Sequence, residues 1–338
     1  MKLPFSYALV GRPSELVILL YYALLFFYMK FGERKGSWKV AVLLCTAMAC
    51  AIFENPLFRK ENTVSFIDVG QGDAAVISTY DGKTYLVDGG GQYGKELGEN
   101  TGTKILLPYL EYLGEDRLEG IFLSHPDSDH MTGLLEIMEA LPVESVYISD
   151  YKFEKTKELL LFQETIAKKQ VSLYTTKIGD YSANGEWECL YPYAGIAFYD
   201  GDDNHGSMVL RYEYGGTEVL FTGDIANLDE QLLLEKGADI SADILKVSHH
   251  GSKYSSSLEF LTAADVETAV ISCGENNLYG HPHQDVLERL ETVGAEIYRT
   301  DLEGSILVTL SPDGTYQIET MTERKPFYER IEEAVEEW

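Results

Sequence analysis

The stretch LSHPDSDHMTG, Leu123–Gly133, decides the fold of this chain. Within six residues it supplies two histidines and two aspartates: His125, Asp127, Asp129 and His130. An apolar, strand-like run precedes it and an apolar helical pattern follows it. A divalent cation needs several nitrogen or oxygen donors within about 2.0–2.2 Å of one point, and one turn supplies only some of them. We therefore expect the other ligands to come from distant strands.

The spacing of these four residues predicts two metal positions. Alternate residues at the end of an extended segment point to the same side, so His125 and Asp127 can share one position. Asp129 and His130 turn with the start of the helix and can serve a second position. A later aspartate, Asp224, is suited to bridge, because a carboxylate has two oxygens. Two cations about 3.5–4 Å apart lower the pKa of a shared water and promote displacement at phosphorus or carbon.

Other polar clusters also follow apolar strand-like runs, and they contain the remaining histidines of the chain. EVLFTG leads to Asp224, DILKVS leads to a pair of histidines, and AVISCG leads to ENNLYGHPH. The histidines concerned are His249, His250, His281 and His283, with His205 in DDNHGS; aspartates at similar positions are Asp68, Asp73 and Asp88. Histidines scattered on a surface would not collect at strand ends, so the pattern indicates one shared site.

The order of the apolar patterns predicts an α+β architecture. Three short strand-like runs within 63–91 lead to alternating helices and strands, with helices expected over 104–114, 131–141 and 155–169. The second half repeats the arrangement, with helices expected over 227–236, 257–263 and 284–294. Two halves of this kind predict two sheets packed face to face with helices outside. We assign this domain to residues 56–322, and an acidic helical tail to 323–338.

The N-terminal segment differs from the rest of the chain. Residues 16–29 and 40–53 each lack charge, and interfacial Trp38 and flanking lysines favour two transmembrane helices within 1–55. Each apolar run is shorter than the roughly 20 residues that a bilayer crossing needs. The loop over 30–39 holds four basic residues against one glutamate. The positive-inside rule therefore predicts a cytoplasmic loop, and a hydrolase domain on the extracellular side of the cell membrane.

Charge and cysteine content restrict the possible functions. The formal net charge is −28, so a polyanionic substrate has to be bound by a local basic patch or by bound cations. The four cysteines form no CxxC pair, which argues against a zinc ribbon or a disulfide framework. Cys189 and Cys273 are best interpreted as small core residues.

The motifs together resemble a known family. SHPDSDHMTG is similar to the HxHxDH signature of the metallo-β-lactamase superfamily, with Asp127 in place of its second histidine. The set FIDVGQGDAAVI, LVDGGG, FTGD, LKVSHHGSKYSSS and YGHPH resembles the C-terminal hydrolase domain of the ComEC family of bacterial DNA-uptake channels, over roughly 62–321. Residues 1–53 look like the last two membrane segments of such a channel. The resemblance implies a metallo-β-lactamase-like αββα sandwich, and a chain that is a fragment, a truncated gene product or a shortened relative of such a channel.

The resemblance also implies roles for individual residues. The implied metal ligands are His125, Asp127, Asp129, His130, His205, Asp224 and His249. For the neighbouring histidines we favour His249 on the metal and His250 on the substrate, with the reverse order left open. His281 is implied to be either a further metal ligand from late in the sequence or a proton donor. The implied catalytic residues are Asp129, His250 and His281. Asp88 is the best candidate to orient a ligating histidine. A carboxylate at Asp127 makes the site harder and favours manganese, with zinc as the alternative.

Three functions agree with these residues. The first is a dinuclear hydrolase with two divalent ions, Zn or Mn, acting as a phosphodiesterase or nuclease on DNA during uptake. The second is a small-molecule phosphoesterase, such as one for phosphorylcholine, whose cationic group suits an acidic surface. The third is a non-catalytic module of a DNA-transport channel. The expected partners are DNA, the membrane and other components of such a channel.

Overall fold

The computed structural model describes residues 15–31, 38–47, 61–91, 101–195 and 202–322. The N-terminal part contains helix α1 (Glu15–Phe31) and a helix over 38–47. Within these ranges no helix is both long and apolar enough to cross a membrane. The two transmembrane helices that the sequence predicts are therefore not found there. Most of the predicted cytoplasmic loop and the whole predicted tail 323–338 lie outside the described residues.

The larger of the two sheets has eight strands in the order β14-β13-β1-β2-β3-β4-β5-β6. The strands from β14 to β3 pair antiparallel, and those from β3 to β6 pair parallel. Their bounds are β1 Asn62–Phe66, β2 Ala75–Ser78, β3 Thr84–Val87, β4 Leu118–Leu123, β5 Val143–Ser149, β6 Ser172–Thr176, β13 Ile306–Leu310 and β14 Tyr316–Thr320.

The smaller sheet has six strands in the order β12-β11-β10-β9-β8-β7. Strands β7 to β9 pair antiparallel, and β9 to β12 pair parallel. The bounds are β7 Trp187–Tyr191, β8 Val209–Tyr214, β9 Thr217–Phe221, β10 Ile244–Lys246, β11 Thr268–Ile271 and β12 Glu296–Arg299. In both sheets, therefore, parallel strands send their carboxyl ends, and the polar residues that follow them, to one edge.

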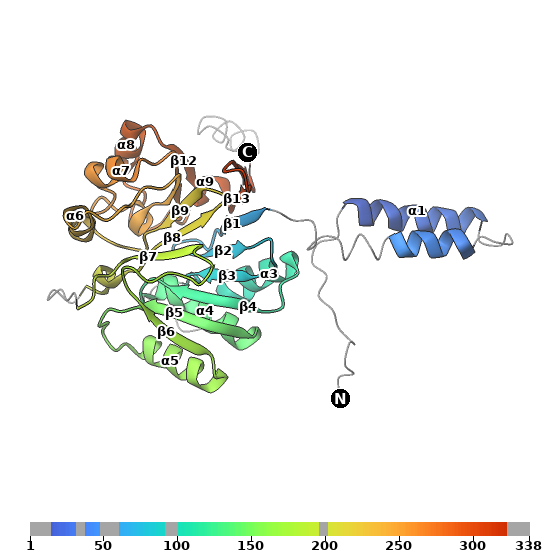
Figure 1. The fold of residues 1–338 in the computed structure, drawn as a ribbon, viewed down its shortest axis with the longest axis horizontal. Coiled ribbons are helices and arrows are strands. Elements are labelled where there is room, and N and C mark those ends of the chain that lie inside the picture. Colours follow the sequence, from blue (N-terminus) through green and yellow to red (C-terminus); the bar gives the residue numbers. More distant parts are fainter. Residues whose placement is uncertain (1–14, 32–37, 48–60, 92–100, 196–201, 323–338) are drawn as a thin grey trace, which may run out of the picture.

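Helices cover the outer faces of both sheets (Figure 1). The larger sheet is covered by η1 Gly102–Leu106, α3 Leu107–Leu113, α4 Ser128–Ala140 and α5 Lys157–Lys169. The smaller sheet is covered by α6 Asn227–Glu235, α7 Leu258–Ala264 and α8 Gln284–Val293. Short helical turns are η2 Asp203–Gly206, η3 Ser248–Gly251 and α9 Thr300–Glu303. The predicted sandwich of two sheets between helical layers is confirmed.

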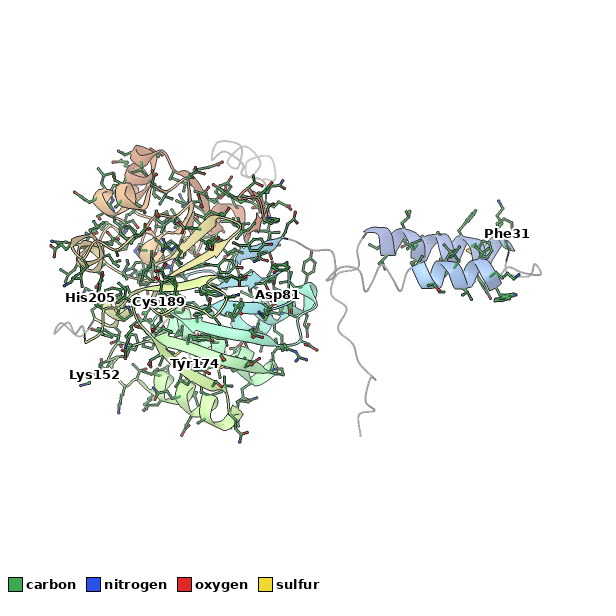
Figure 2. All side chains as sticks on the ribbon, viewed as in Figure 1. Phe31, Asp81, Lys152, Tyr174, Cys189 and His205 are labelled. Atoms are coloured by element: carbon green, nitrogen blue, oxygen red, sulfur yellow. The ribbon has the colours of Figure 1, made fainter. Side chains whose placement is uncertain are left out.

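Three apolar clusters join these four layers. The cluster between the sheets is rich in aromatic rings, with Trp187 packed 4.4 Å from Phe122 and 4.7 Å from Tyr212 between ring centroids. A second cluster joins the larger sheet to α3, α4 and α5, and a third joins the smaller sheet to α6, α7 and α8. The two cysteines interpreted as core residues, Cys189 and Cys273, are buried in this packing, and Figure 2 labels Cys189 on β7.

Glycines bring the loop after β3 against helix α4. The backbone N–H of Gly89 donates to the carbonyl of His130 at 2.7 Å, and that of Gly133 donates to the carbonyl of Gly90 at 3.0 Å. A Cβ atom on Gly133 would lie 1.9 Å from the carbonyl oxygen of Gly89, which no side chain can tolerate. The DGGG and HMTG segments therefore meet backbone to backbone, and this contact places Asp88 beside His130.

Candidate metal centre

The candidate site lies where strands of both sheets end. Asp88 follows β3, His125 follows β4, Asp224 follows β9, His250 follows β10 and Ser272 follows β11. The carboxyl ends of parallel strands meet at one sheet edge, and the sandwich brings the two edges together. The polar clusters that the sequence places after apolar runs thus converge from segments more than a hundred residues apart.

Three buried histidines each have the Nδ1 side of the ring held by another group. The carboxylate of Asp88 lies 2.9 Å from Nδ1 of His130, and the Ser124 hydroxyl lies 3.1 Å from Nδ1 of His125. Nδ1 of His250 lies 3.0 Å from the carbonyl oxygen of residue 272. Groups bound at Nδ1 fix the orientation of the ring and direct Nε2 away from them.

The Nε2 atoms of these histidines face carboxylates at distances typical of a shared cation rather than of direct hydrogen bonds. Nε2 of His130 lies 3.4 Å from Oδ1 of Asp224, and Nε2 of His250 lies 3.5 Å from Oδ2 of the same carboxylate. Nε2 of His250 is also 3.5 Å from Oδ2 of Asp129. Each oxygen of Asp224 thus faces a different histidine of the centre.

Four groups of donor atoms lie close enough to share a cation. Within each group the candidate atoms are all within 4.8 Å of one another. The groups are His125, His130 and Asp224; Asp129, His130 and His250; Asp73, Asp88 and His130; and Asp73, Asp224 and His250. Because His130, His250 and Asp224 each belong to more than one group, the four groups form one centre with adjoining positions for cations.

The donors at this centre fit divalent cations. Nε2 of His125, His130 and His250 and Oδ1 of Asp224 are buried without a hydrogen-bond partner in the described part of the chain. Buried polar atoms are normally satisfied, so several unsatisfied atoms that face one another indicate a ligand. Imidazole nitrogens combined with carboxylate oxygens suit zinc and manganese.

The electrostatics of the centre favour positive charge. Burial disfavours the charged form of His250, but Asp224 and Asp73 outweigh it and raise the pKa of His250 to about 10. Burial likewise opposes ionisation of Asp224, yet His250 and His130 hold its pKa well below the ordinary value. The carboxylates that retain protons on these rings would stabilise a metal ion in the same place.

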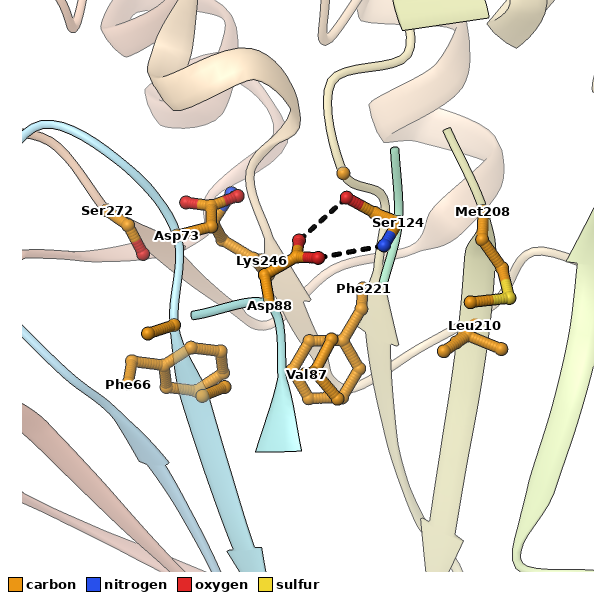
Figure 3. Close-up of a pocket in the computed structure, with 13 residues that line it drawn as sticks. Phe66, Asp73, Val87, Asp88, Ser124, Met208, Leu210, Phe221, Lys246 and Ser272 are labelled. Atoms are coloured by element: carbon orange, nitrogen blue, oxygen red, sulfur yellow. Dashed lines mark hydrogen bonds and ion pairs between the residues drawn. The ribbon is translucent and has the colours of Figure 1, made fainter. Parts of the chain in front are cut away.

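Beneath the centre, a buried ion pair joins the two sheets. The Lys246 ammonium donates to Oδ2 of Asp73, and both side chains are almost fully buried. Oδ1 of Asp73 lies 3.3 Å from Nδ1 of His250. Figure 3 shows both residues at a cavity between the sheets, where Ser124 also donates to Asp88. The volume of this cavity is about 20 Å³. The lysine offsets one of the carboxylate charges gathered around the histidines.

The backbone separates the two neighbouring histidines of SHHGS. His249 and His250 both have positive φ, 49° and 55°, which is unusual for residues with side chains and recurs at functional sites. Their ring planes differ by 80°. His250 is buried and belongs to two of the donor groups, whereas the side chain of His249 is 28% exposed and belongs to none. Nε2 of His249 lies 3.7 Å from Oδ2 of Asp224, so this ring stands at the rim.

Two further predicted ligands lie outside the four donor groups. Asp127 precedes α4, its side chain is 41% exposed, and its Oδ2 lies 3.7 Å from Nε2 of His125. His205, labelled in Figure 2, lies on η2 with Nδ1 2.8 Å from the buried carboxylate of Asp229. This carboxylate contact matches the one that Asp88 makes with His130. Both assignments as ligands remain predictions.

His281 lies at the mouth of the centre. Its ring centroid is 5.8 Å from that of His249 and 6.2 Å from that of His250. Partial burial, together with His250 and His249, lowers the pKa of His281 to about 4. The imidazole is therefore neutral at pH 7 and can accept or relay a proton, whereas donation requires that it first gain one.

Sequence reasoning missed several groups that build the centre. Lys246, Ser124, Ser272 and Asp229 were not predicted, although each contacts a candidate ligand or its support. Lys246 carried a detectable signal, because a lysine inside the apolar run DILKV demands a buried counter-charge. Asp68 lies apart from the donor groups, and its carboxylate accepts from the N–H of Gly70 in the turn after β1.

Comparison with known proteins agrees with this fold. The profile of the Metallo-beta-lactamase superfamily matches residues 67–275, and the chain belongs to that superfamily. ComEC-family competence proteins are among its relatives. It is 29% identical over 317 residues to ComE operon protein 3 of Bacillus subtilis, covering 88% of this chain and 40% of that protein.

Two further relatives are similar to this chain over the same extent. Competence protein ComA of Neisseria gonorrhoeae is 29% identical over 322 residues, covering 91% of this chain and 40% of that protein. Recombination protein 2 of Haemophilus influenzae is 30% identical over 291 residues, covering 86% of this chain and 34% of that protein. The chain thus spans between a third and two fifths of the length of these relatives.

Proposed function

We propose that this chain is a dinuclear metal-dependent phosphodiesterase that acts on DNA. One observation carries the proposal: the Nε2 atoms of His125, His130 and His250 are buried, lack hydrogen-bond partners among the described residues, and converge with Asp224. The similarity to competence proteins supports DNA as the substrate.

Two adjoining positions would hold the cations, zinc or manganese. The inner position would use Asp129, His130 and His250, and the outer one His125 and Asp127, with Asp224 between them and His205 as a further outer ligand. We thus assign His250 to the metal and His249 to the rim, the reverse of the order favoured from the sequence. When bound, divalent cations supply positive charge for a phosphoryl oxygen and lower the pKa of a water.

The remaining residues of the chain would position the reactants. Asp88, Ser124 and the carbonyl of residue 272 hold the histidine rings in place. His249 and His281, at the mouth, would contact the phosphate or the departing oxygen, and neutral His281 can relay a proton. The burial of the centre would exclude bulk water from the ligands.

A direct test uses the full chain. With Mn²⁺ or Zn²⁺ added, the protein should hydrolyse bis(p-nitrophenyl) phosphate and cleave labelled DNA. Asp129→Ala and Asp224→Asn should each lower both rates by about 100-fold or more, because the charge stabilisation from the cations would be lost. Hydrolysis that persists in Asp129→Ala would contradict the proposal. Asp116→Asn, an exposed aspartate paired with Arg117, is the matched control.

A second candidate is a phosphoesterase for a cationic substrate such as phosphorylcholine. The net charge of −28 favours it, because an acidic surface attracts a quaternary ammonium group. Turnover of p-nitrophenyl phosphorylcholine beside intact DNA would support this activity and contradict the nuclease.

Membrane attachment and an extracellular hydrolase domain form part of the proposal. Helix α1 supports attachment, because it exposes many large apolar side chains, among them Leu19, Tyr22, Phe26 and Met29. Exposed apolar surface of this extent is typical of contact with a membrane or a protein partner, such as another part of a DNA-uptake channel. Fractionation of cells, with protease added to intact cells, tests both location and side.

A further inference from the structure

Two exposed loops at the mouth of the candidate centre carry aromatic side chains. Tyr254 follows the SHHGS turn and is 64% exposed, and Tyr279 precedes His281 and is 52% exposed. The loops are joined by hydrogen bonds, since the N–H of His283 donates to the carbonyl of Gly251 at 2.9 Å and the N–H of residue 253 donates to Nδ1 of His283 at 3.2 Å. The two loops therefore lie side by side, and we call Lys253, Tyr254 and Tyr279 the tyrosine rim.

The tyrosine rim is continuous with the candidate ligands. The ring of Tyr279 is stacked on His281, with 5.6 Å between centroids and 23° between planes. His281 in turn lies 5.8 Å from His249 and 6.2 Å from His250 between centroids. A group resting on Tyr279 would thus lie a few side chains away from a phosphate at the metal centre.

The charge beside Tyr254 selects between ligands. The Lys253 ammonium lies 5.1 Å from the centre of the Tyr254 ring. A cation already on this ring disfavours a quaternary ammonium group there, whereas it attracts a phosphate. Exposed tyrosine rings beside a lysine are suited to nucleotides, whose bases stack on aromatic rings while the backbone binds cations.

We propose that Tyr254, Tyr279 and Lys253 bind single-stranded nucleic acid beside the metal centre, with bases stacked on the two tyrosines and a backbone phosphate on the lysine. The assignment of this substrate rests on the proposed phosphodiesterase function. Single strands are favoured because the flat faces of paired bases are covered within a duplex, while unpaired bases are free to stack on tyrosine.

Binding and cleavage by the full chain test this proposal separately. Fluorescence anisotropy in EDTA measures affinity for a labelled single-stranded oligonucleotide and for an abasic strand of the same length. Tyr254→Ala and Tyr279→Ala should each weaken binding of the oligonucleotide by about 5- to 100-fold, and should weaken abasic binding much less. The Phe variants at both positions retain a ring and should restore binding. Tyr112→Ala on α3, a similarly exposed tyrosine, is the matched control.

The outcomes distinguish this proposal from the proposed function. Equal losses for the oligonucleotide and the abasic strand, failure of the Phe variants to restore binding, or unchanged affinity in the Ala variants would each overturn the tyrosine rim. A selective effect on p-nitrophenyl phosphorylcholine would also overturn it. Hydrolysis of bis(p-nitrophenyl) phosphate by the unsubstituted protein reports on the metal centre alone. If this hydrolysis is absent, the proposed phosphodiesterase function is contradicted. The anisotropy measurements would still test nucleic-acid binding by the tyrosine rim.

Discussion

The carboxylate of Asp88 lies 2.9 Å from Nδ1 of His130, on the side of the ring opposite to the Nε2 atom that faces Asp224. Asp88 itself has a positive φ of 55° and accepts from both the N–H and the hydroxyl of Ser124. One buried carboxylate therefore orients His130 and holds the start of the HPDSDH turn.

Asp88→Asn tests this relationship. The amide keeps the shape and one acceptor oxygen but loses the charge that orients the imidazole, so metal affinity should fall by about 10- to 100-fold. Competition with a chromophoric chelator measures the change. Asp116→Asn serves as the control for loss of a carboxylate, and equal affinities in Asp88→Asn and the unsubstituted protein would contradict the role.

Alanine at either of the adjacent histidines decides which one binds metal. His250→Ala removes a buried member of two donor groups, so the protein should retain about one equivalent of metal fewer by elemental analysis. His249→Ala removes a partly exposed ring at the rim, so the metal content should be preserved while phosphodiester turnover falls. The opposite pattern would restore the order favoured from the sequence.

The sequence does not determine which of His249 and His250 reaches the centre. The position of the polar clusters after strands predicted that His125, His130, Asp224 and the histidine pair share one edge, and the structure brings the first three together with His250. Alternation of side chains, which was used to choose between the paired histidines, holds only for extended backbone. At SHHGS the chain leaves the extended region, because both histidines have positive φ, so alternation no longer says which ring turns inward. The sequence predicts that one histidine of this pair reaches the centre. The local backbone conformation determines which of the two rings points inward.

Other features were missed because their causes lie in distant segments. Asp73 and Lys246 are 173 residues apart and meet only when the two sheets pack. Strand β6, SLYTT, was not predicted, since it lies at the edge of the larger sheet and most of its residues are exposed, which removes the apolar alternation of a half-buried strand. The helices of the sandwich were predicted well because each buries one apolar stripe.

Lys246→Met tests the buried ion pair. Methionine fills a similar volume but removes the ammonium partner of the buried Asp73 carboxylate, which should destabilise the fold by about 3–5 kcal/mol. Urea unfolding in EDTA measures the loss. Adding Asp73→Asn should recover part of it, because the buried negative charge that the lysine offset is then removed. A double variant that is less stable than Lys246→Met would contradict the account.

Gly133→Ala tests the contact between the DGGG loop and α4. A Cβ atom there would overlap the carbonyl oxygen of Gly89, so α4 or the loop has to shift. We expect a loss of about 2–4 kcal/mol in unfolding free energy together with weaker metal binding, because Asp88 moves with the loop. Gly179→Ala is the control for glycine replacement: an added Cβ meets no atom there, so it should lose only the roughly 1–2 kcal/mol that a left-handed backbone with φ of 84° costs. Similar losses in both variants would contradict a specific role for the contact.

Asp127→His tests the metal preference of the outer position. Asp127 stands where the superfamily signature has its second histidine, and its carboxylate lies 3.7 Å from Nε2 of His125. An imidazole there is softer than a carboxylate, so the ratio of zinc to manganese affinity should rise by about tenfold or more. Equilibrium dialysis against both ions, followed by elemental analysis, measures the ratio. Asp116→His, at an exposed aspartate paired with Arg117, controls for the added histidine. If the ratio rises equally in both variants, Asp127 does not bind the metal and the outer position is formed without it.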